Sequence, residues 1–177
     1  FAGELIAFRA DNAEEQWRSK LSSEILSPPV ASGDLLVVHT FDGKLYGLEE
    51  TTGKQRWVYD GNLPVLTMRG TSQPVFYEGL VLVGQANGKW IALDRENGQL
   101  RWERRVAIAQ GKSEIERIVD IDASPFISSG LVYAVSFQGR IVAFEARTGR
   151  PVWQAKESSY SDMAEGFGNI YVSSSQG

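Results

Sequence analysis

Short apolar segments alternate with turn residues along most of the chain. In one well-defined stretch the apolar segments run from Leu35 to His39, from Leu45 to Leu48 and from Gln55 to Tyr59. Segments of this length, rich in Val, Leu and Tyr and bounded by Gly, Asp and Thr, predict β-strands rather than helices. The pattern therefore predicts an all-β protein built from short strands.

This strand pattern belongs to a repeat of 29 residues. The unit Pro29 to Trp57, PVASGDLLVVHTFDGKLYGLEETTGKQRW, recurs without a gap from Pro74 to Trp102 and from Pro125 to Trp153. A partial unit opens the chain, because Gly3 stands 14 residues before Trp17 as Gly43 does before Trp57. Repeats of four short strands at a period of about 40 to 50 residues are typical of β-propeller blades.

Each unit contains two turns that include a glycine. The first turn lies at Asp42-Gly43, Asn87-Gly88 and Gln138-Gly139. It predicts a two-residue hairpin with a tight primed turn, because Asn, Asp and Gly tolerate positive φ. The second predicts the closure of the next hairpin, at Thr52-Gly53, Asn97-Gly98 and Thr148-Gly149. In the opening unit Ala13 replaces this second glycine, so we expect its turn to be built differently.

The tryptophan that ends each unit is expected to lie between blades. A blade exposes an apolar face that only its neighbour can cover, so Trp17, Trp57, Trp102 and Trp153 are interpreted as wedges between blades. Trp90 is expected in the core. The blades divide the chain into residues 1–28 (a part blade), 29–73, 74–124, 125–162, and 163–177 (the start of another blade).

Three blades with two part blades are fewer than the seven or eight that such units usually close. We therefore interpret the chain, which begins at Phe1 inside a repeat, as a fragment of a ring expected to have eight blades. A four-blade ring closed by the two part blades is the alternative. Exposed sheet edges would also allow a dimer or swapped pairing between two copies.

Composition narrows the function classes. A net charge of −4 and a pI near 5.1, without a Lys/Arg cluster, argue against a nucleic-acid or anionic-membrane binder. The chain has no cysteine and one histidine, His39, which is expected to be packed or at the surface rather than catalytic. No nucleophile motif, phosphate-binding glycine loop or EF-hand spacing is found, so no catalytic residue, cofactor or metal site is predicted.

The repeat resembles that of the PQQ-like propeller family, as the string ALDRENGQLRW and its variants GLEETTGKQRW and AFEARTGRPVW show. Two connections between units, LPVLTMRG (residues 63–70) and GKSEIERIVDIDASP (residues 111–125), resemble the propeller lipoprotein family of the bacterial outer-membrane β-barrel assembly machinery. That resemblance implies a non-catalytic scaffold at the periplasmic face of the outer membrane. It further implies an N-terminal lipid anchor upstream of Phe1 and the POTRA domains of the central barrel subunit as partner.

Carried over by motif, the resemblance places partner-binding residues in the two connections: Leu66, Met68 and Arg69 in the first, Asp120 and Asp122 in the second. Apolar side chains beside an arginine suit a binding hot spot, but Leu66 and Met68 could instead form a small core beneath the connection. The aspartates could meet a basic partner, hold the segment by accepting backbone hydrogen bonds, or bind a cation. The stretch SEIERIV is open between one helical turn and a solvated loop.

Two other functions remain open. A quinoprotein (PQQ) dehydrogenase would share the blades, but it would need a calcium-bound quinone and typically a vicinal cysteine pair, and this chain has no cysteine. A generic propeller interaction module would keep the blades and assign no role to either connection. One fold hosts all three functions, so the connections carry the distinction.

Overall fold

Every regular element of the described chain is a β-strand. The structure, a computed structural model, describes residues 3–25, 27–61, 72–85, 88–105, 126–135, 140–157 and 163–173. Within these ranges no helix is long and apolar enough to cross a membrane.

The strands form three antiparallel four-stranded sheets, each ordered as in the sequence, and two half sheets. The first blade comprises β3 (Val30–Ser32), β4 (Leu35–His39), β5 (Lys44–Glu49) and β6 (Gln55–Asp60). The second comprises β7 (Val75–Tyr77), β8 (Leu80–Gln85), β9 (Lys89–Asp94) and β10 (Leu100–Arg105). The third comprises β11 (Phe126–Ser128), β12 (Leu131–Val135), β13 (Ile141–Glu145) and β14 (Pro151–Ala155).

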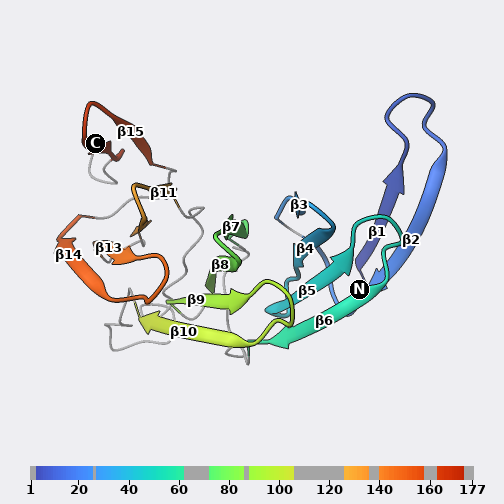
Figure 1. Ribbon diagram of the computed structural model, residues 1–177, viewed down its shortest axis with the longest axis horizontal. Helices are drawn as coiled ribbons and strands as arrows, with labels where there is room; N and C mark the ends of the chain where they lie inside the picture. The colour runs from blue at the N-terminus through green and yellow to red at the C-terminus, as the bar shows by residue number, and fades with distance from the viewer. Residues whose placement is uncertain are drawn as a thin grey trace, which may run out of the picture.

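The half sheets stand at the two ends of the molecule. The N-terminal hairpin pairs β1 (Gly3–Phe8) with β2 (Glu15–Leu21), and the C-terminal hairpin pairs β15 (Ala164–Gly166) with β16 (Asn169–Tyr171). Figure 1 shows the sheets following one another along an open arc, with the two hairpins at its opposite ends. The predicted all-β propeller with four-stranded blades is confirmed.

Each apolar core lies between two successive sheets. Between the first and second blades, Leu35, Val37 and Leu45 pack with Val81 and Ile91. Equivalent cores join the second blade to the third, and each end blade to its neighbouring hairpin. The central strands β5 and β9 are buried along four successive residues because sheets cover both of their faces.

The tryptophan wedges follow one geometry. The indoles of Trp17, Trp57 and Trp102 lie against Gly53, Gly98 and Gly149 of the following sheet, where an added Cβ would come within 2.3 to 2.6 Å of a ring carbon. Their Nε1 groups donate to the carbonyls of Glu50, Arg95 and Ala146, each three residues before that glycine, at 2.9 to 3.0 Å. The wedge interpretation is confirmed for these three residues. Trp153 differs: it is 40% exposed and packs beside Tyr133 of its own sheet.

A β-bulge directs each tryptophan toward the next sheet. The pairing register slips by one residue at the same repeat position in all four hairpins, so Arg56, for example, has no partner on β5 while Trp57 faces Gly47. An extra residue of this kind bends the strand and redirects its side chains. The residue opposite the tryptophan is small in every case: Ala7, Gly47, Ala92 and Ala143.

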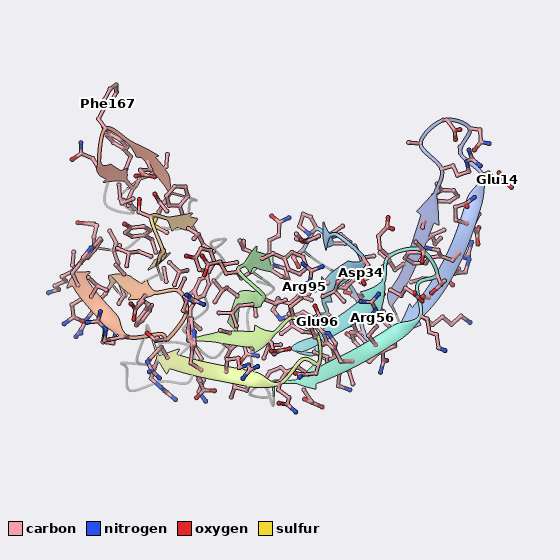
Figure 2. The ribbon with its side chains drawn as sticks, in the orientation of Figure 1. Glu14, Asp34, Arg56, Arg95, Glu96 and Phe167 are labelled. Atoms are coloured by element: carbon pink, nitrogen blue, oxygen red, sulfur yellow. The ribbon has the colours of Figure 1, made fainter. Side chains whose placement is uncertain are left out.

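Besides the tryptophan contact, which we call the tryptophan joint, a group of polar side chains holds the first two blades together. Arg95, in the turn after β9, donates from Nη2 to the Ser32 carbonyl at 2.7 Å and to Asp34 at 3.2 Å. Arg56 binds the other Asp34 carboxylate oxygen at 2.8 Å, and its hydrogen bond holds the Asp34 pKa below the ordinary value. Figure 2 shows Asp34, Arg56 and Arg95 grouped where these two blades meet.

Two predictions about turns are wrong. The Asp42-Gly43 hairpin is a three-residue loop, because Thr40 N–H bonds to Lys44 O and Gly43 N–H to Thr40 O, and only Gly43 has positive φ. The turn at Ala13 copies the glycine turns: its N–H bonds to Arg9 O as that of Gly53 does to Glu49 O, and its φ is 58°. Alanine there occupies the left-handed region at a cost of about 1 kcal/mol.

The tight primed turns occur elsewhere in the unit. Positive φ at both central residues, the signature of a type I′ turn, occurs at Glu78-Gly79, Ser129-Gly130 and Phe167-Gly168, between the first two strands of a sheet. Of the other predicted hairpin turns, Gly88 has positive φ, whereas Asn87, Gln138 and Gly139 lie outside the described residues.

Candidate partner-binding face

Both long connections leave the blades at the same edge of the sheets. In a four-stranded antiparallel sheet the first strand begins, and the fourth ends, at the edge that carries the turn between the second and third strands. That edge carries the turn Thr40 to Gly43, the turn before β9, and both ends of the connections after β6 and β10. We call it the connection face.

The predicted binding residues fall, by sequence, in the two long connections that depart from this face. Leu66, Met68 and Arg69 fall between β6 and β7, and Asp120 and Asp122 fall between β10 and β11. All five lie outside the described residues, as does the stretch SEIERIV. Their role stays a prediction, and the described residues define the sheet edge from which their segments depart.

The buried polar side chains of the described chain gather at this edge. They are Ser27, His39, Thr40, Ser72 and Gln85, each at most 5% exposed. They lie where β4 and β8 end, or in the segments that precede β3 and β7. Elsewhere in the described blades the buried side chains are apolar. The connection face therefore rests on a polar layer that packing of the blades alone does not require.

His39 links this layer to the first long connection. Its ring nitrogen Nδ1 lies 3.1 Å from the carbonyl oxygen of Ser72, the first described residue after that connection. A neutral imidazole that carries its proton on Nδ1 donates this hydrogen bond. Burial lowers the pKa of His39, and this effect outweighs the Ser72 carbonyl and the Asp42 carboxylate, which favour the charged form. Of the two positions expected for His39, packed or at the surface, the structure shows the packed one.

Gly61 marks where the chain leaves the first blade. A Cβ at Gly61 would lie 2.4 Å from Nε2 of Gln85 and 2.9 Å from the carbonyl oxygen of Gly43. The backbone thus passes tightly between the second-to-third-strand turns of two neighbouring sheets. Nε2 of Gln85 is buried and has no hydrogen-bond partner among the described residues.

Asp42 anchors a hydrogen-bond network at the same edge. Its two carboxylate oxygens accept from the hydroxyls of Thr40 and Ser22, both at 2.6 Å, and the Ser22 hydroxyl accepts from Tyr46 at 2.9 Å. Partial burial raises the pKa of Asp42, but these hydrogen bonds and the Lys44 charge outweigh it, so the net pKa is lowered. Asp42 therefore stays ionised and ties the first blade to the chain after β2.

Sequence reasoning missed the polar layer, although a signal was present. The apolar runs of β4 and β8 end in His39-Thr40 and Gly84-Gln85, where polar side chains follow buried valines. Polar residues that directly continue a fully buried strand call for hydrogen-bond partners. No group of three or more His, Cys, Asp or Glu able to hold a metal ion occurs among the residues that the structure describes.

Comparison with known proteins gives a consistent result. The family model described as "Outer membrane protein assembly factor BamB" matches residues 2–177. The chain belongs to the BamB family. A BamB from Shewanella oneidensis is 37% identical over 162 residues, which is 92% of this chain and 41% of that protein. A BamB from Pseudomonas aeruginosa is 48% identical over 118 residues, or 67% of this chain and 31% of that protein.

Solved structures agree with this membership. The crystal structure of BamB from Moraxella catarrhalis superposes with a TM-score of 0.85 and 34% identity, covering 91% of this chain and 49% of that one. A quinohemoprotein alcohol dehydrogenase from Pseudomonas putida superposes with a TM-score of 0.67 at 20% identity, which shows a shared fold alone. The chain spans about two fifths of the length of the BamB relatives it matches.

The buried histidine predicts a pH dependence of stability. Because the pKa of His39 is lower in the folded chain than the ordinary 6.5, the unfolded chain takes up its proton first as the pH falls. The free energy of unfolding should therefore decline from about pH 6.5 downward until the folded-state pKa is passed. Urea titrations at pH 7.5 and 5.5 measure this decline, which should be smaller in His39→Gln. An equal decline in both proteins would contradict the assignment.

Proposed function

We propose that this chain is part of a non-catalytic scaffold that assists the assembly of β-barrel proteins into the bacterial outer membrane. The observation that carries the proposal is the match to the BamB family over residues 2–177, with relatives named as outer membrane protein assembly factors. The expected location is the periplasmic face of the outer membrane, with a lipid anchor supplied upstream of Phe1.

The partner proposed for this scaffold is the POTRA region of the central barrel subunit, bound at the connection face. Supporting this choice, both long connections depart from one edge of adjacent blades, so a single partner surface can reach both. The contact between His39 and the Ser72 carbonyl holds the end of β4 against the first described residue after the first connection. A rigid edge lowers the entropy that a binding segment loses on association.

A capture experiment with the purified POTRA region tests this proposal. Arg69→Ala and Asp122→Ala should each weaken capture of the full chain by about tenfold, because truncating a hot-spot side chain costs more than 1 kcal/mol. Matched controls are Arg147→Ala and Asp11→Ala, which remove exposed charges from turns at the opposite edge of the sheets and should leave capture unchanged.

Tryptophan fluorescence of each variant separates binding from folding. If capture falls while the emission spectrum stays that of the parent chain, the two connections bind the partner. Unchanged capture by both variants would remove them from the interface, and a joint loss of capture and native fluorescence would make them structural. Saturable binding of PQQ with Ca²⁺, accompanied by dye-linked alcohol oxidation, would overturn the non-catalytic assignment.

A further inference from the structure

The turn that precedes the tryptophan of each repeat is stabilised by the same side-chain hydrogen bond four times. The residue before the positive-φ position of this turn is Asn12, Thr52, Asn97 or Thr148. A side-chain oxygen of each accepts the backbone N–H two residues later, at 2.9 to 3.2 Å. Of these four residues, Asn97 alone combines a side-chain amide with a following glycine.

An asparagine followed by glycine is chemically labile. The backbone nitrogen of the glycine attacks Cγ of the asparagine, a new C–N bond closes a succinimide ring, and the C–N bond of the side-chain amide breaks to release ammonia. Water then breaks one of the two C–N bonds of the ring and leaves aspartate or isoaspartate. Glycine favours the attack because it has no Cβ to hinder the approach, whereas Ala13 carries a Cβ beside Asn12.

Hydrogen bonds oppose this reaction at Asn97 in the folded chain. The N–H of Gly98, which carries the attacking nitrogen, donates to the Asp94 carbonyl at 2.9 Å. Oδ1 of Asn97 accepts from the N–H of Gln99 at 2.9 Å, and the N–H of Asn97 donates to Oδ1 of Asp94 at 3.2 Å. Asn97 is exposed to water, but both reacting groups are held by other partners. The turn therefore has to open before the ring can close.

The first blade holds this turn in place. Trp57 donates from Nε1 to the Arg95 carbonyl at 2.9 Å, and a Cβ added at Gly98 would come 2.6 Å from Cε3 of the indole. The side chain of Arg95 is bound in turn to Ser32 and Asp34, and Figure 2 shows Arg95 near Asp34 where the two blades meet. The tryptophan joint between the first and second blades thus holds both ends of the segment 95–98.

We propose that Asn97 is a deamidation site gated by the tryptophan joint between the first and second blades, and that isoaspartate formed there keeps this joint from closing again. The reaction consumes water and needs no other reactant. In the antiparallel sheet this turn lies at the edge opposite the connection face, so the inference is independent of the proposed POTRA partner.

The two products differ in what they do to the joint. Aspartate keeps a side-chain oxygen where Oδ1 was and leaves the length of the backbone unchanged. Isoaspartate routes the backbone through the side chain, which adds one carbon before Gly98 and a free carboxylate near Asp94 and Glu96. The Asp94 N–H donates to the Gln99 carbonyl at 2.7 Å and closes the turn at a fixed length. The extra carbon should therefore displace Gly98 from the indole of Trp57.

Peptide mapping of the full chain, aged in mildly alkaline buffer and digested with trypsin, tests the gate. Cleavage after Arg95 and Arg101 releases residues 96–101 as one peptide, separate from the peptides that contain Asn12 and Asn87. Deamidation of Asn97 should be roughly tenfold slower in the folded chain than in the same chain in guanidinium chloride, because only the opened fraction reacts. Equal rates in the two states, or no reaction at Asn97 in the denaturant, would overturn the proposal.

Two matched substitutions locate the gate. Trp57→Phe removes the Nε1 donor and part of the ring from the joint that holds the Asn97 turn, and Trp102→Phe does the same at the next joint; both indoles are 6% exposed. In chains that circular dichroism shows to be folded, Trp57→Phe should speed deamidation of Asn97 by roughly tenfold, whereas Trp102→Phe should leave it unchanged. Equal acceleration by both would identify the gate as global unfolding, and no acceleration by Trp57→Phe would remove this joint from the gate.

Urea unfolding of the aged chain tests the consequence for the joint. The chain carries Asn87→Gln for this purpose, which removes the other Asn-Gly pair. The isoaspartyl form, isolated by chromatography, should unfold at a lower urea concentration than the parent. Asn97→Asp, which reproduces the other product, and Asn97→Thr, which copies two other repeats, should both unfold close to the parent. An isoaspartyl form as stable as the parent would overturn the proposed effect on the joint.

Discussion

Trp102→Ala is expected to lower the free energy of unfolding by about 4 kcal/mol, the range for removing a buried tryptophan from a core. The indole is 6% exposed and donates to the carbonyl of Ala146. Its ring centroid lies 6.4 Å from that of Phe144. Loss of the indole opens a cavity between the second and third blades and leaves the Ala146 carbonyl without its donor. Urea unfolding followed by circular dichroism measures the change.

Trp153→Ala is the matched control for this substitution. It removes the same side chain at the same repeat position, but from a site that is 40% exposed. It should cost about 1 kcal/mol, because less apolar area leaves water there on folding. Equal losses at the two sites would contradict the view that the following sheet supplies most of the energy of the wedge.

Gly98→Ala should destabilise the chain by about 3 kcal/mol, the second-largest effect that we expect. Gly98 has φ of +69°, where alanine pays about 1 kcal/mol. The new Cβ would also lie 2.6 Å from Cε3 of Trp57, a rigid ring held between two sheets, so the blades themselves have to move apart. Thermal or urea unfolding of the variant measures the loss.

Gly79→Ala separates the two causes. Gly79 has φ of +81°, but a Cβ there meets no atom within 4 Å. Alanine at this position should therefore lower the free energy of unfolding by the backbone strain alone, about 1 kcal/mol. The difference between the two variants measures the steric part of the Trp57 joint, and a difference near zero would show that the indole can move aside freely.

The fold could be predicted because the chain contains three copies of one 29-residue unit. The 29-residue unit repeats its strands, turns and final tryptophan in register, so a misreading of one copy is corrected by the others. The predicted strand from Leu35 to His39 matches β4 in both bounds. β5 extends one residue beyond the prediction at each end, and β6 extends one residue beyond it at its last residue. The three-residue strands such as β3 were too short to show a period.

Turn geometry was harder to predict because local residue preference competes with the sheet around it. Asp42-Gly43 has the composition of a primed turn, yet Phe41 joins the loop and the Asp42 side chain is held by Thr40 and Ser22. Ala13 takes a glycine conformation because the flanking strands of the hairpin impose it. Glu78 and Ser129 adopt positive φ although neither residue type favours it.

The candidate site was predictable only in outline. The two long connections stand out by length, and the antiparallel order of the sheets places both at one edge. The five residues assigned to binding came from resemblance and remain predictions. The polar layer at the connection face went unnoticed because His39 and Ser72 are 33 residues apart and meet only through the packing of two blades.

The acceptor in each tryptophan joint has a consequence for how such a chain can change over generations. The indoles of Trp17, Trp57 and Trp102 bond to main-chain carbonyls, so the acceptor residue is free to be acidic in Glu50, basic in Arg95 or apolar in Ala146. A substitution at that position keeps the hydrogen bond of the indole, although at Arg95 it would remove the polar contacts with Ser32 and Asp34. The surface side chains of neighbouring blades can therefore change separately in each repeat, while the hydrogen bond between the indole and the main-chain carbonyl is kept.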